Sequence, residues 1–298
     1  MDRSTVRELE CFLVIAENLN FSRAARQLHL SQPPLTRHIQ SLETKLGAKL
    51  FTRNTHQVSL TEAGLLFLED ARSILNHLDR AGETIRRLSQ GETSRLRLAF
   101  IGALLDERLV AVIQRFRESN PTCQVQITDL SPAAQIAAIK AGELDGGFIG
   151  AKPEQGMRNF EFIVWATEPL LLGLPERHEL SKVRILTWNH MKSRNWVMVS
   201  RLAAPAFRQQ FAKIEKNHKL AAKIIQESDR VPAILTMVAA GNGITMVPQS
   251  VTHLISKGVV FRQLPAPAPM LEHAFAHRPE QHSSVLAAFL KFISSKST

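Results

Sequence analysis

The 298-residue chain has few cysteines and no long apolar run, and each absence excludes a class of protein. Its two cysteines, Cys11 and Cys123, cannot build the disulfide framework of a small secreted domain. No segment approaches the roughly 18 consecutive apolar residues of a membrane-spanning helix, and the N-terminal segment carries charges where a signal peptide needs apolar residues. We therefore expect a protein of the reducing cytoplasm that does not contact a membrane.

The short motifs of common enzymes are also missing. The sequence contains no G-x-S-x-G, no H-E-x-x-H, no clustered pair of acids and no glycine-rich phosphate loop. His273 and His277 are four residues apart, but the segment around them indicates a strand, and no further metal ligand accompanies them. We predict that the chain is not an enzyme and holds neither a metal nor a cofactor.

The charge of the chain is strongly positive but unevenly placed. With 37 Lys+Arg against 27 Asp+Glu, the formal net charge is +10, which points to a partner of negative charge. The first 90 residues contribute only +2, however, whereas the segment 177–230 holds 12 basic and 4 acidic residues. A prediction of nucleic-acid binding must therefore depend on particular residues and their placement.

Three short helices are predicted near the N-terminus. Apolar residues recur at helical spacing over 6–19, and segment 21–30 carries two alanines that permit close packing of helices. Ser31 is expected to cap a third helix, with prolines in its first turn and Gly47 at its end. The residues expected on its buried face are Leu35, Ile39, Leu42 and Leu46. The second and third helices, joined by a tight turn, form a predicted helix-turn-helix.

The polar face of the third helix has the chemistry of a DNA reader. Gln32 and Arg37 are able to make paired hydrogen bonds with adenine and guanine edges in the major groove. The residues after Gly47 indicate a β-hairpin whose Arg53 would meet the DNA backbone or the minor groove. The alternative for polar residues on an isolated helix is a solvated surface. The predicted DNA-binding residues are Ser31, Gln32, Pro33, Pro34, Thr36, Arg37, Gln40 and Arg53.

A long helix without proline is predicted from residue 62 to about residue 90. Six of its small or apolar residues fall at alternating three- and four-residue steps, which is the spacing of a seam between two helices. These residues are Leu68, Ala71, Leu75, Leu78, Gly82 and Ile85. Such a helix next to a DNA-binding unit indicates a dimer that presents two recognition helices to successive turns of the groove.

The rest of the chain alternates between predicted strands and helices. Strands are expected at 95–102, 123–130 and 144–150 with helices between them, which indicates a mainly parallel sheet covered by helices on both faces. A second α/β lobe begins near Pro169, and the chain then returns to the first lobe with a strand at 270–277 and a closing helix. Ligands of such sheets collect at the carboxyl ends of the strands.

The N-terminal motifs resemble one known family. The segment LECFLVIAENLNFSRAARQLHLSQPPLTRHIQSLETKLGAKLFTR, followed by VSLTEAG and the long helix, is similar to the N-terminal region of the LysR-type transcriptional regulators, and the likeness extends over residues 4–90. It implies a winged helix-turn-helix DNA-binding domain at 4–61, with the helix-turn-helix at 21–40, and an all-α linker or dimerisation helix at 62–90.

For the remainder of the chain, the resemblance implies an α/β, two-lobed, periplasmic-binding-protein-like effector domain. The segment AAGNGITMVP at 239–248 is similar to one that this domain usually contains. The implied bounds are 95–298 for the domain, about 95–165 and 268–298 for lobe I, and about 166–267 for lobe II.

The resemblance also implies partners and a mechanism. Double-stranded DNA with an interrupted inverted repeat would be bound by a homotetramer, a dimer of dimers of this chain. A small effector between the lobes would favour one lobe arrangement and so change the bend of the DNA and the contact with RNA polymerase, which is transcription regulation by population shift.

Among these regulators, the effector domain most resembles the subgroup that responds to aromatic acids and to muconate. An anionic effector is therefore expected, with Arg201 as its carboxylate anchor and Phe207 as an apolar wall. Ala103 and Pro132 stand where hydroxyl-bearing residues are common in the family, so two hydrogen-bond donors are absent. The effector-binding residues implied by position are Gly102, Ala103, Ser131, Pro132, Ser200, Arg201, Phe207 and Val231.

Several alternatives stay open at this point. Arg201 is equally explained as a solvated surface charge and Phe207 as a core residue. The chain as a whole is alternatively a small-molecule-binding protein, or a redox-sensing regulator without a carboxylate effector. A redox sensor needs an exposed thiol of low pKa, and the positions of Cys11 and Cys123 favour inert thiols instead.

Overall fold

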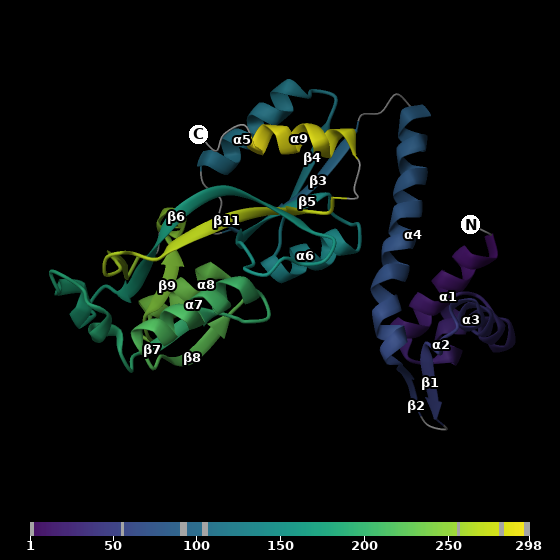
Figure 1. The fold of residues 1–298 in the computed structure, drawn as a ribbon, viewed down its shortest axis with the longest axis horizontal. Coiled ribbons are helices and arrows are strands. Elements are labelled where there is room, and N and C mark those ends of the chain that lie inside the picture. Colours follow the sequence, from purple (N-terminus) through teal and green to yellow (C-terminus); the bar gives the residue numbers. More distant parts are fainter. Residues whose placement is uncertain are drawn as a thin grey trace. The chain divides into compact units, whose positions relative to one another are not determined.

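The structure, a computed structural model, describes residues 3–54, 57–89, 94–102, 107–254, 257–279 and 283–294. The chain divides into two compact units, one made of residues 1–92 with 140–143 and the other of the remaining residues. We describe each unit by itself (Figure 1). None of the helices in the described ranges combines the length and the apolar character needed to cross a membrane.

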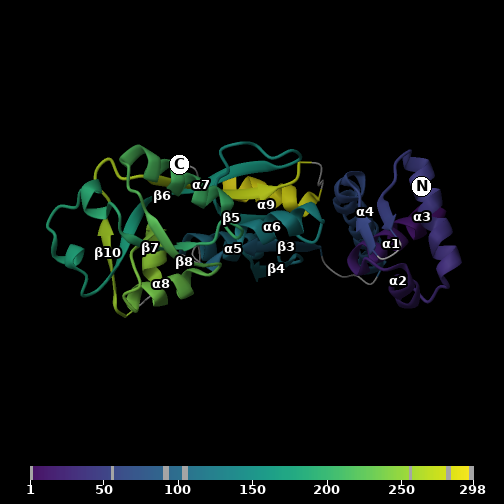
Figure 2. The same ribbon diagram turned by 90° about the horizontal axis from the view of Figure 1, so that it is seen from below.

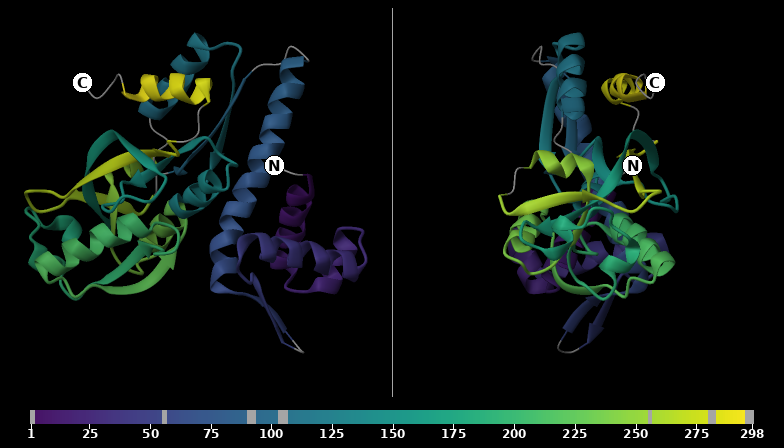
Figure 3. Two further views of the ribbon diagram at one scale, coloured as in Figure 1. Left: turned by 45° about the vertical axis from the view of Figure 1, so that its right-hand side comes forward. Right: turned by 90° about the vertical axis from the view of Figure 1, so that its left-hand side faces the viewer.

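The first unit has the elements that the sequence predicts. They are α1 (Arg3–Asn18), α2 (Phe21–Gln27), α3 (Gln32–Leu46), β1 (Phe51–Asn54), β2 (Gln57–Leu60) and α4 (Glu62–Ser89). β1 and β2 pair as an antiparallel hairpin that projects away from the helices (Figure 3). Gly47 adopts φ +67° directly after α3, which confirms its predicted role as the residue that ends this helix.

One aromatic core holds the first unit together. The ring of Phe12 lies 5.4 Å from that of Phe51 and 5.2 Å from that of Phe67, so α1, β1 and α4 share one apolar cluster. Ala24 and Ala25 of α2 are buried in this cluster, as the sequence predicts. Their small side chains let the helices approach each other closely.

Two local predictions for α3 are wrong. Leu46 is 43% exposed, because the helix ends there, beyond the buried row of Leu35, Ile39 and Leu42. Ser31 occupies the N-cap position, but its side chain makes no capping hydrogen bond. The preceding helix, α2, is instead the one with a side-chain cap, since Asn20 Oδ1 accepts from the backbone N–H of Arg23 at 2.9 Å.

The linker helix α4 is anchored at its start by Thr61. The Thr61 hydroxyl donates to the carbonyl of Lys49 at 2.6 Å and accepts from the N–H of Gly64 at 3.0 Å. The predicted seam divides along the helix. Ala71 is fully buried and Leu68 and Leu75 pack partly into the unit's own core, whereas Leu78 and Ile85 are 51% and 66% exposed. The first half of the seam therefore faces the DNA-binding unit itself, which corrects the prediction of a continuous seam toward a partner helix.

The second unit combines helices with a mixed sheet. Its helices are α5 (Glu107–Ser119), α6 (Pro132–Lys140), α7 (Pro205–His218), α8 (Val231–Ala239) and α9 (Ser284–Ser294), with short 3-10 turns η2 (Glu179–Lys182), η3 (Trp188–Met191) and η4 (Gln249–His253). Its strands are β3 (Arg95–Phe100), β4 (Gln124–Asp129), β5 (Gly146–Ala151), β6 (Glu161–Pro175), β7 (Asn195–Val199), β8 (Lys223–Ser228), β9 (Thr245–Pro248), β10 (Val259–Gln263) and β11 (Met270–His277).

The strand order corrects the prediction of a mainly parallel sheet. Within the described residues, the main sheet has the order β10-β6-β11-β5-β3-β4, with β9 also paired to β6. The β3–β4 and β3–β5 pairs are parallel, and β7 pairs with β8 in parallel in a separate sheet. All pairs that involve β6 or β11 are antiparallel, because these strands carry the chain out of the first lobe and back into it.

Separate hydrophobic cores define the two lobes. In the first lobe, α5 and α9 pack on one side of β3 and β5 through a cluster of aromatic rings, among them Phe116, Phe148 and Phe289. In the second, Trp196 and Phe211 lie at the centre of a cluster built from β6, β7, β9 and α7 (Figure 2). The long strands β6 and β11 run side by side and join the two lobes.

Candidate nucleic-acid interface and ligand cavity

The third helix presents one apolar face to the core and one polar face to solvent. The predicted DNA-binding residues that are exposed are Ser31, Gln32, Pro33, Arg37 and Gln40, and the half-buried ones are Pro34 and Thr36. Arg37 makes no hydrogen bond or ion pair with another described residue, so its guanidinium is available to a partner. The structure therefore brings these residues together on a single exposed surface. The side chain of Arg53 is outside the described part of the chain.

The N-terminal end of α3 has the features of a phosphate-binding position. Because Ser31 does not cap the helix, the first backbone N–H groups of α3 are not occupied by its hydroxyl. Unoccupied N–H groups at a helix N-terminus favour an anion such as a phosphate group. Next to them, the Gln32 carbonyl oxygen accepts from the Ser22 hydroxyl at 3.2 Å, which links the side chains of α2 and α3 at this surface.

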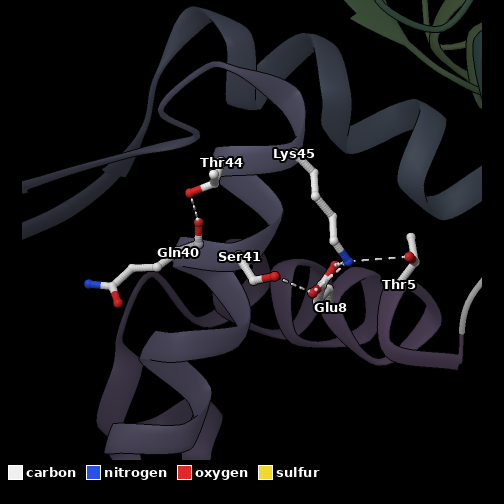
Figure 4. Close-up of polar contacts among 6 residues, drawn as sticks. All are labelled: Thr5, Glu8, Gln40, Ser41, Thr44 and Lys45. Atoms are coloured by element: carbon white, nitrogen blue, oxygen red, sulfur yellow. Dashed lines mark hydrogen bonds and ion pairs between the residues drawn. The ribbon is translucent and has the colours of Figure 1, made fainter.

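A buried carboxylate fixes the angle between α1 and α3. The side chain of Glu8 is 3% exposed, and it accepts hydrogen bonds from Lys45 Nζ at 2.8 Å and from the Ser41 hydroxyl at 2.7 Å. Gln40 points away from this cluster, toward the other side of the helix (Figure 4). Glu8 thus holds α3 from behind while the polar residues remain on the outer surface. The sequence analysis missed Glu8, because a lone acid beside an apolar stripe carries no distinctive pattern.

Glu43 connects the other end of α3 to the hairpin. Its carboxylate accepts from the backbone N–H of Leu50 at 2.9 Å and pairs with Lys49 Nζ at 2.8 Å. Burial acts to raise the pKa of Glu43, but these hydrogen bonds outweigh it and the pKa is lowered, so the group is ionised at neutral pH. The hairpin and the recognition helix are therefore held in a fixed relation.

The second unit contains a cavity of about 440 Å³ between its two lobes. Pockets of this size hold small organic ligands. Five of the predicted effector-binding residues line it, from both lobes: Gly102, Ser131, Pro132, Phe207 and Val231. Ala103 falls outside the described residues.

Ser200 and Arg201 are not among the residues that line the cavity. Arg201 is exposed, and the Ser200 hydroxyl accepts from the N–H of Ala203 at 3.1 Å. The guanidinium at the cavity is that of Arg230, the N-cap residue of α8, whose Nη1 lies 2.6 Å from Asp129 Oδ2. Sequence reasoning missed both members of this pair, because their partnership depends on the packing of one lobe against the other.

Contacts from the first lobe to the second close the cavity at its rim. Asp129, at the end of β4, uses its other oxygen to accept from the N–H of Gly102 at 3.2 Å, which positions it for Arg230. Beside it, the N–H of Ala133 in the first turn of α6 donates to the carbonyl of Ala203 at 3.0 Å. The two lobes are thus in direct contact on both sides of residues 130–132, and the structure has a closed cavity.

A buried polar network lies behind the cavity, where β6 and β11 cross. Glu168 of β6 accepts from the backbone N–H of Ser250 at 2.6 Å, from the Ser250 hydroxyl at 2.7 Å, and from Nε2 of His273. Burial acts to raise the pKa of Glu168, but the hydrogen bonds from His273 and Ser250 outweigh it, so the pKa is lowered. His273 itself is 1% exposed and lines the cavity.

The two cysteines have the properties of inert thiols. Cys11 is fully buried, and burial raises the pKa of its thiol to about 11. Cys123 is 9% exposed, and burial raises its pKa as well. A thiol is reactive as the thiolate, so neither residue has the low pKa and the exposure that a redox sensor needs. This geometry disfavours the redox-sensing alternative.

Both units match one family of known proteins. Residues 6–65 match the family described as "Bacterial regulatory helix-turn-helix protein, lysR family", and residues 89–297 match the "LysR substrate binding domain". The chain belongs to the LysR family. This LysR-family protein is a DNA-binding transcriptional regulator with an effector-binding domain. Its similar proteins are named as regulators and not as enzymes, in agreement with the prediction from the sequence.

Relatives of this LysR-family protein cover nearly its whole length. The transcriptional regulator ClcR of Pseudomonas putida is 31% identical over 290 residues, which are 96% of this chain and 97% of that protein. AlsR of Bacillus subtilis is 27% identical over 96% of this chain and 94% of AlsR. The crystal structure of CbnR, a LysR family transcriptional regulator, is 26% identical, covers 100% of both chains and gives a TM-score of 0.71. A structure of full-length CbnR with its target DNA gives a TM-score of 0.70 at 27% identity, and covers 99% of both chains.

Proposed function

We propose that this protein regulates transcription in response to a small molecule bound in the cavity between the two lobes. The observation that carries the proposal is the cavity itself, about 440 Å³ in volume and lined by residues from both lobes. A ligand that touches both lobes has different contacts in their open and closed arrangements. It therefore shifts the population toward the arrangement that it binds better.

The DNA-binding surface proposed for this regulator is the outer face of α3. Gln32, Arg37 and Gln40 would contact base edges, whereas Ser31, Thr36 and the prolines would lie at the DNA backbone, together with Arg53 of the hairpin. The proposal is supported by the exposure of this face and by the contacts of Glu8 and Glu43, which hold α3 from the opposite side. Since the DNA of a bacterium is in its cytoplasm, we propose that the protein acts there.

A dimer of dimers is the assembly that we propose. The apolar side chains of Leu65, Leu66, Leu78 and Ile85 on α4 are 51–71% exposed. A partner helix would cover this apolar surface and would place two recognition helices on one DNA molecule. The tetramer, the interrupted inverted repeat as its DNA site and the contact with RNA polymerase remain implications of membership in the family.

Replacing Arg37 by alanine is expected to remove most of the sequence preference of this protein. A bidentate contact between arginine and guanine contributes about 1–3 kcal/mol of discrimination per half-site, which is roughly 5- to 150-fold in affinity. The measurement is the ratio of affinities for a duplex selected from a random library and for a scrambled duplex, at one salt concentration. Arg37→Lys is the control, because it keeps the charge and loses the paired donors. A uniform loss of affinity for both duplexes in Arg37→Ala would reduce Arg37 to a phosphate contact.

Filling the cavity is expected to uncouple the protein from its effector. Val231 lines the cavity at the first turn of α8, so a tryptophan at this position occupies space that the ligand needs. We expect Val231→Trp to bind DNA but to lose any ligand-dependent change in the footprint on the DNA upstream of its own gene. Val110→Trp is the matched control, since Val110 is 41% exposed on α5 and away from the cavity. An unchanged ligand response in Val231→Trp would contradict the proposal.

A further inference from the structure

We propose that the effector of this regulator is an uncharged, mainly apolar molecule that donates a hydrogen bond to His273. This inference rests on the proposed function, since it assigns a chemical class to the ligand of the same cavity. It replaces the expectation of an anionic effector anchored by Arg201.

The walls of the cavity are made chiefly of hydrocarbon side chains. Both lobes contribute them, and they include Ile101, Ile136, Ile149, Met157, Phe207 and Met246. Apolar surface of this kind favours a ligand of matching apolar surface, because both are removed from water together. The bulk of the ligand is therefore expected to be hydrocarbon.

The charged groups at the cavity do not favour an anion. The described lining includes two carboxylates, Asp129 and Asp229, and one guanidinium, Arg230. Arg230 already pairs with Asp129 at 2.6 Å. Because both side chains of this pair are partly exposed, the pair contributes little to stability, but it leaves no net positive charge to attract a carboxylate. A ligand carboxylate would have to displace Asp129 from Arg230 and would then lie beside two negative charges.

His273 provides the polar contact inside the cavity. Its Nε2 is occupied by Glu168, and its Nδ1 is buried and has no hydrogen-bond partner among the described residues. In a protonated ring, Nδ1 would be a charged N–H donor without a partner, which costs more than an unpaired acceptor on a neutral ring. The geometry thus favours a neutral imidazole that donates to Glu168 and offers Nδ1 as an acceptor. An O–H or N–H group on the ligand satisfies it.

The test is a series of probes of one shape and different head groups, titrated calorimetrically into the full-length protein at pH 7.5. 2-Naphthylmethanol is uncharged and has one donor, and its methyl ether lacks the donor. 2-Naphthoate is the anion, and 2-naphthylmethylammonium is the cation. We expect the alcohol to bind most tightly and the ether about tenfold more weakly, which is the ordinary contribution of one hydrogen bond. Tighter binding of the naphthoate or of the ammonium, or equal binding of alcohol and ether, would overturn the inference and leave the proposed function intact.

Two variants locate the contacts. His273→Phe is expected to abolish the difference between alcohol and ether, whereas the matched control His277→Phe, on the same strand but not at the cavity, keeps that difference. Asp129→Asn frees Arg230 and is expected to increase the affinity for naphthoate at least about tenfold without changing that for the alcohol. No gain for naphthoate in this variant would contradict the role assigned to Asp129. Absence of binding by every probe would count against the cavity as a ligand site, and so against the proposed function itself.

Discussion

Replacing Gly64 by alanine is expected to destabilise the N-terminal unit by about 3 kcal/mol or more, at the upper end of the range for overpacking. A Cβ at this position would lie 2.1 Å from the carbonyl oxygen of Leu50 and 3.0 Å from Leu60 Cδ2. The Leu50 oxygen belongs to the backbone and already accepts from the N–H of Thr61 at 3.0 Å, so it has little freedom to move. The first turn of α4 and the base of the hairpin would have to separate.

The control for Gly64→Ala is the same change in the same helix. A Cβ at Gly82 would meet no atom within 4 Å, and alanine has a higher helix propensity than glycine by about 1 kcal/mol, so Gly82→Ala is expected to stabilise the protein slightly. Urea denaturation gives the two free-energy changes, and hydrogen exchange followed by mass spectrometry assigns them to the N-terminal unit. Equal effects at the two positions would show that the contact with Leu50 is not what requires glycine.

Removing the carboxylate of Glu168 is expected to cost the second unit about 3–5 kcal/mol, because three buried donors lose their acceptor at once. These donors are the backbone N–H and hydroxyl of Ser250 and Nε2 of His273. Glu161→Ala is the matched control on the same strand. Glu161 lies 3.5 Å from His277 but its side chain is 61% exposed, so we expect a change within about 0.5 kcal/mol. A similar cost for both variants would contradict the special role of Glu168.

The same carboxylate predicts a pH dependence of stability. The pKa of Glu168 is lowered in the folded protein, so its contribution is fully present above the unfolded pKa of about 4.3 and is lost as the pH falls through the lower, folded pKa. The difference in unfolding free energy between wild type and Glu168→Ala should therefore be constant at neutral pH and should shrink in acid. Urea denaturation at a series of pH values measures this difference. A difference that grows toward low pH would show that Glu168 is protonated in the native state.

The N-terminal unit could be predicted nearly element by element, because its pattern is local. Helical spacing of apolar residues, two alanines for close packing and Gly47 as a terminator are all visible in short segments, and the structure places each element as expected. The errors are at positions where the third dimension decides. Leu68 and Leu75 have seam spacing, but that spacing does not say whether the facing surface belongs to a partner or to the same unit.

The cavity could be predicted only in part, for the same physical reason. Gly102 and Ser131 follow strands at the edge where ligands bind, and this was visible in the order of strands and helices. The pairing of Asp129 with Arg230 joins residues 101 positions apart in the sequence, and the network of Glu168 and His273 joins residues 105 apart. Neither pair has a local pattern, so sequence reasoning assigned the charge at the cavity to Arg201 instead.

The register of the two crossing strands gives His273 a mechanical role as well as a chemical one. Along β6 and β11 the pairing is regular except for a bulge between His273 and Ala274, and β11 shifts again relative to β5 one residue later. A bulge concentrates bending and twisting of a β-ribbon at one step. Any rotation of one lobe against the other would therefore turn the imidazole ring through the same angle. In this protein, the angle between the lobes and the direction of the hydrogen bond to the ligand form a single coordinate, so a ligand reads the one by making the other.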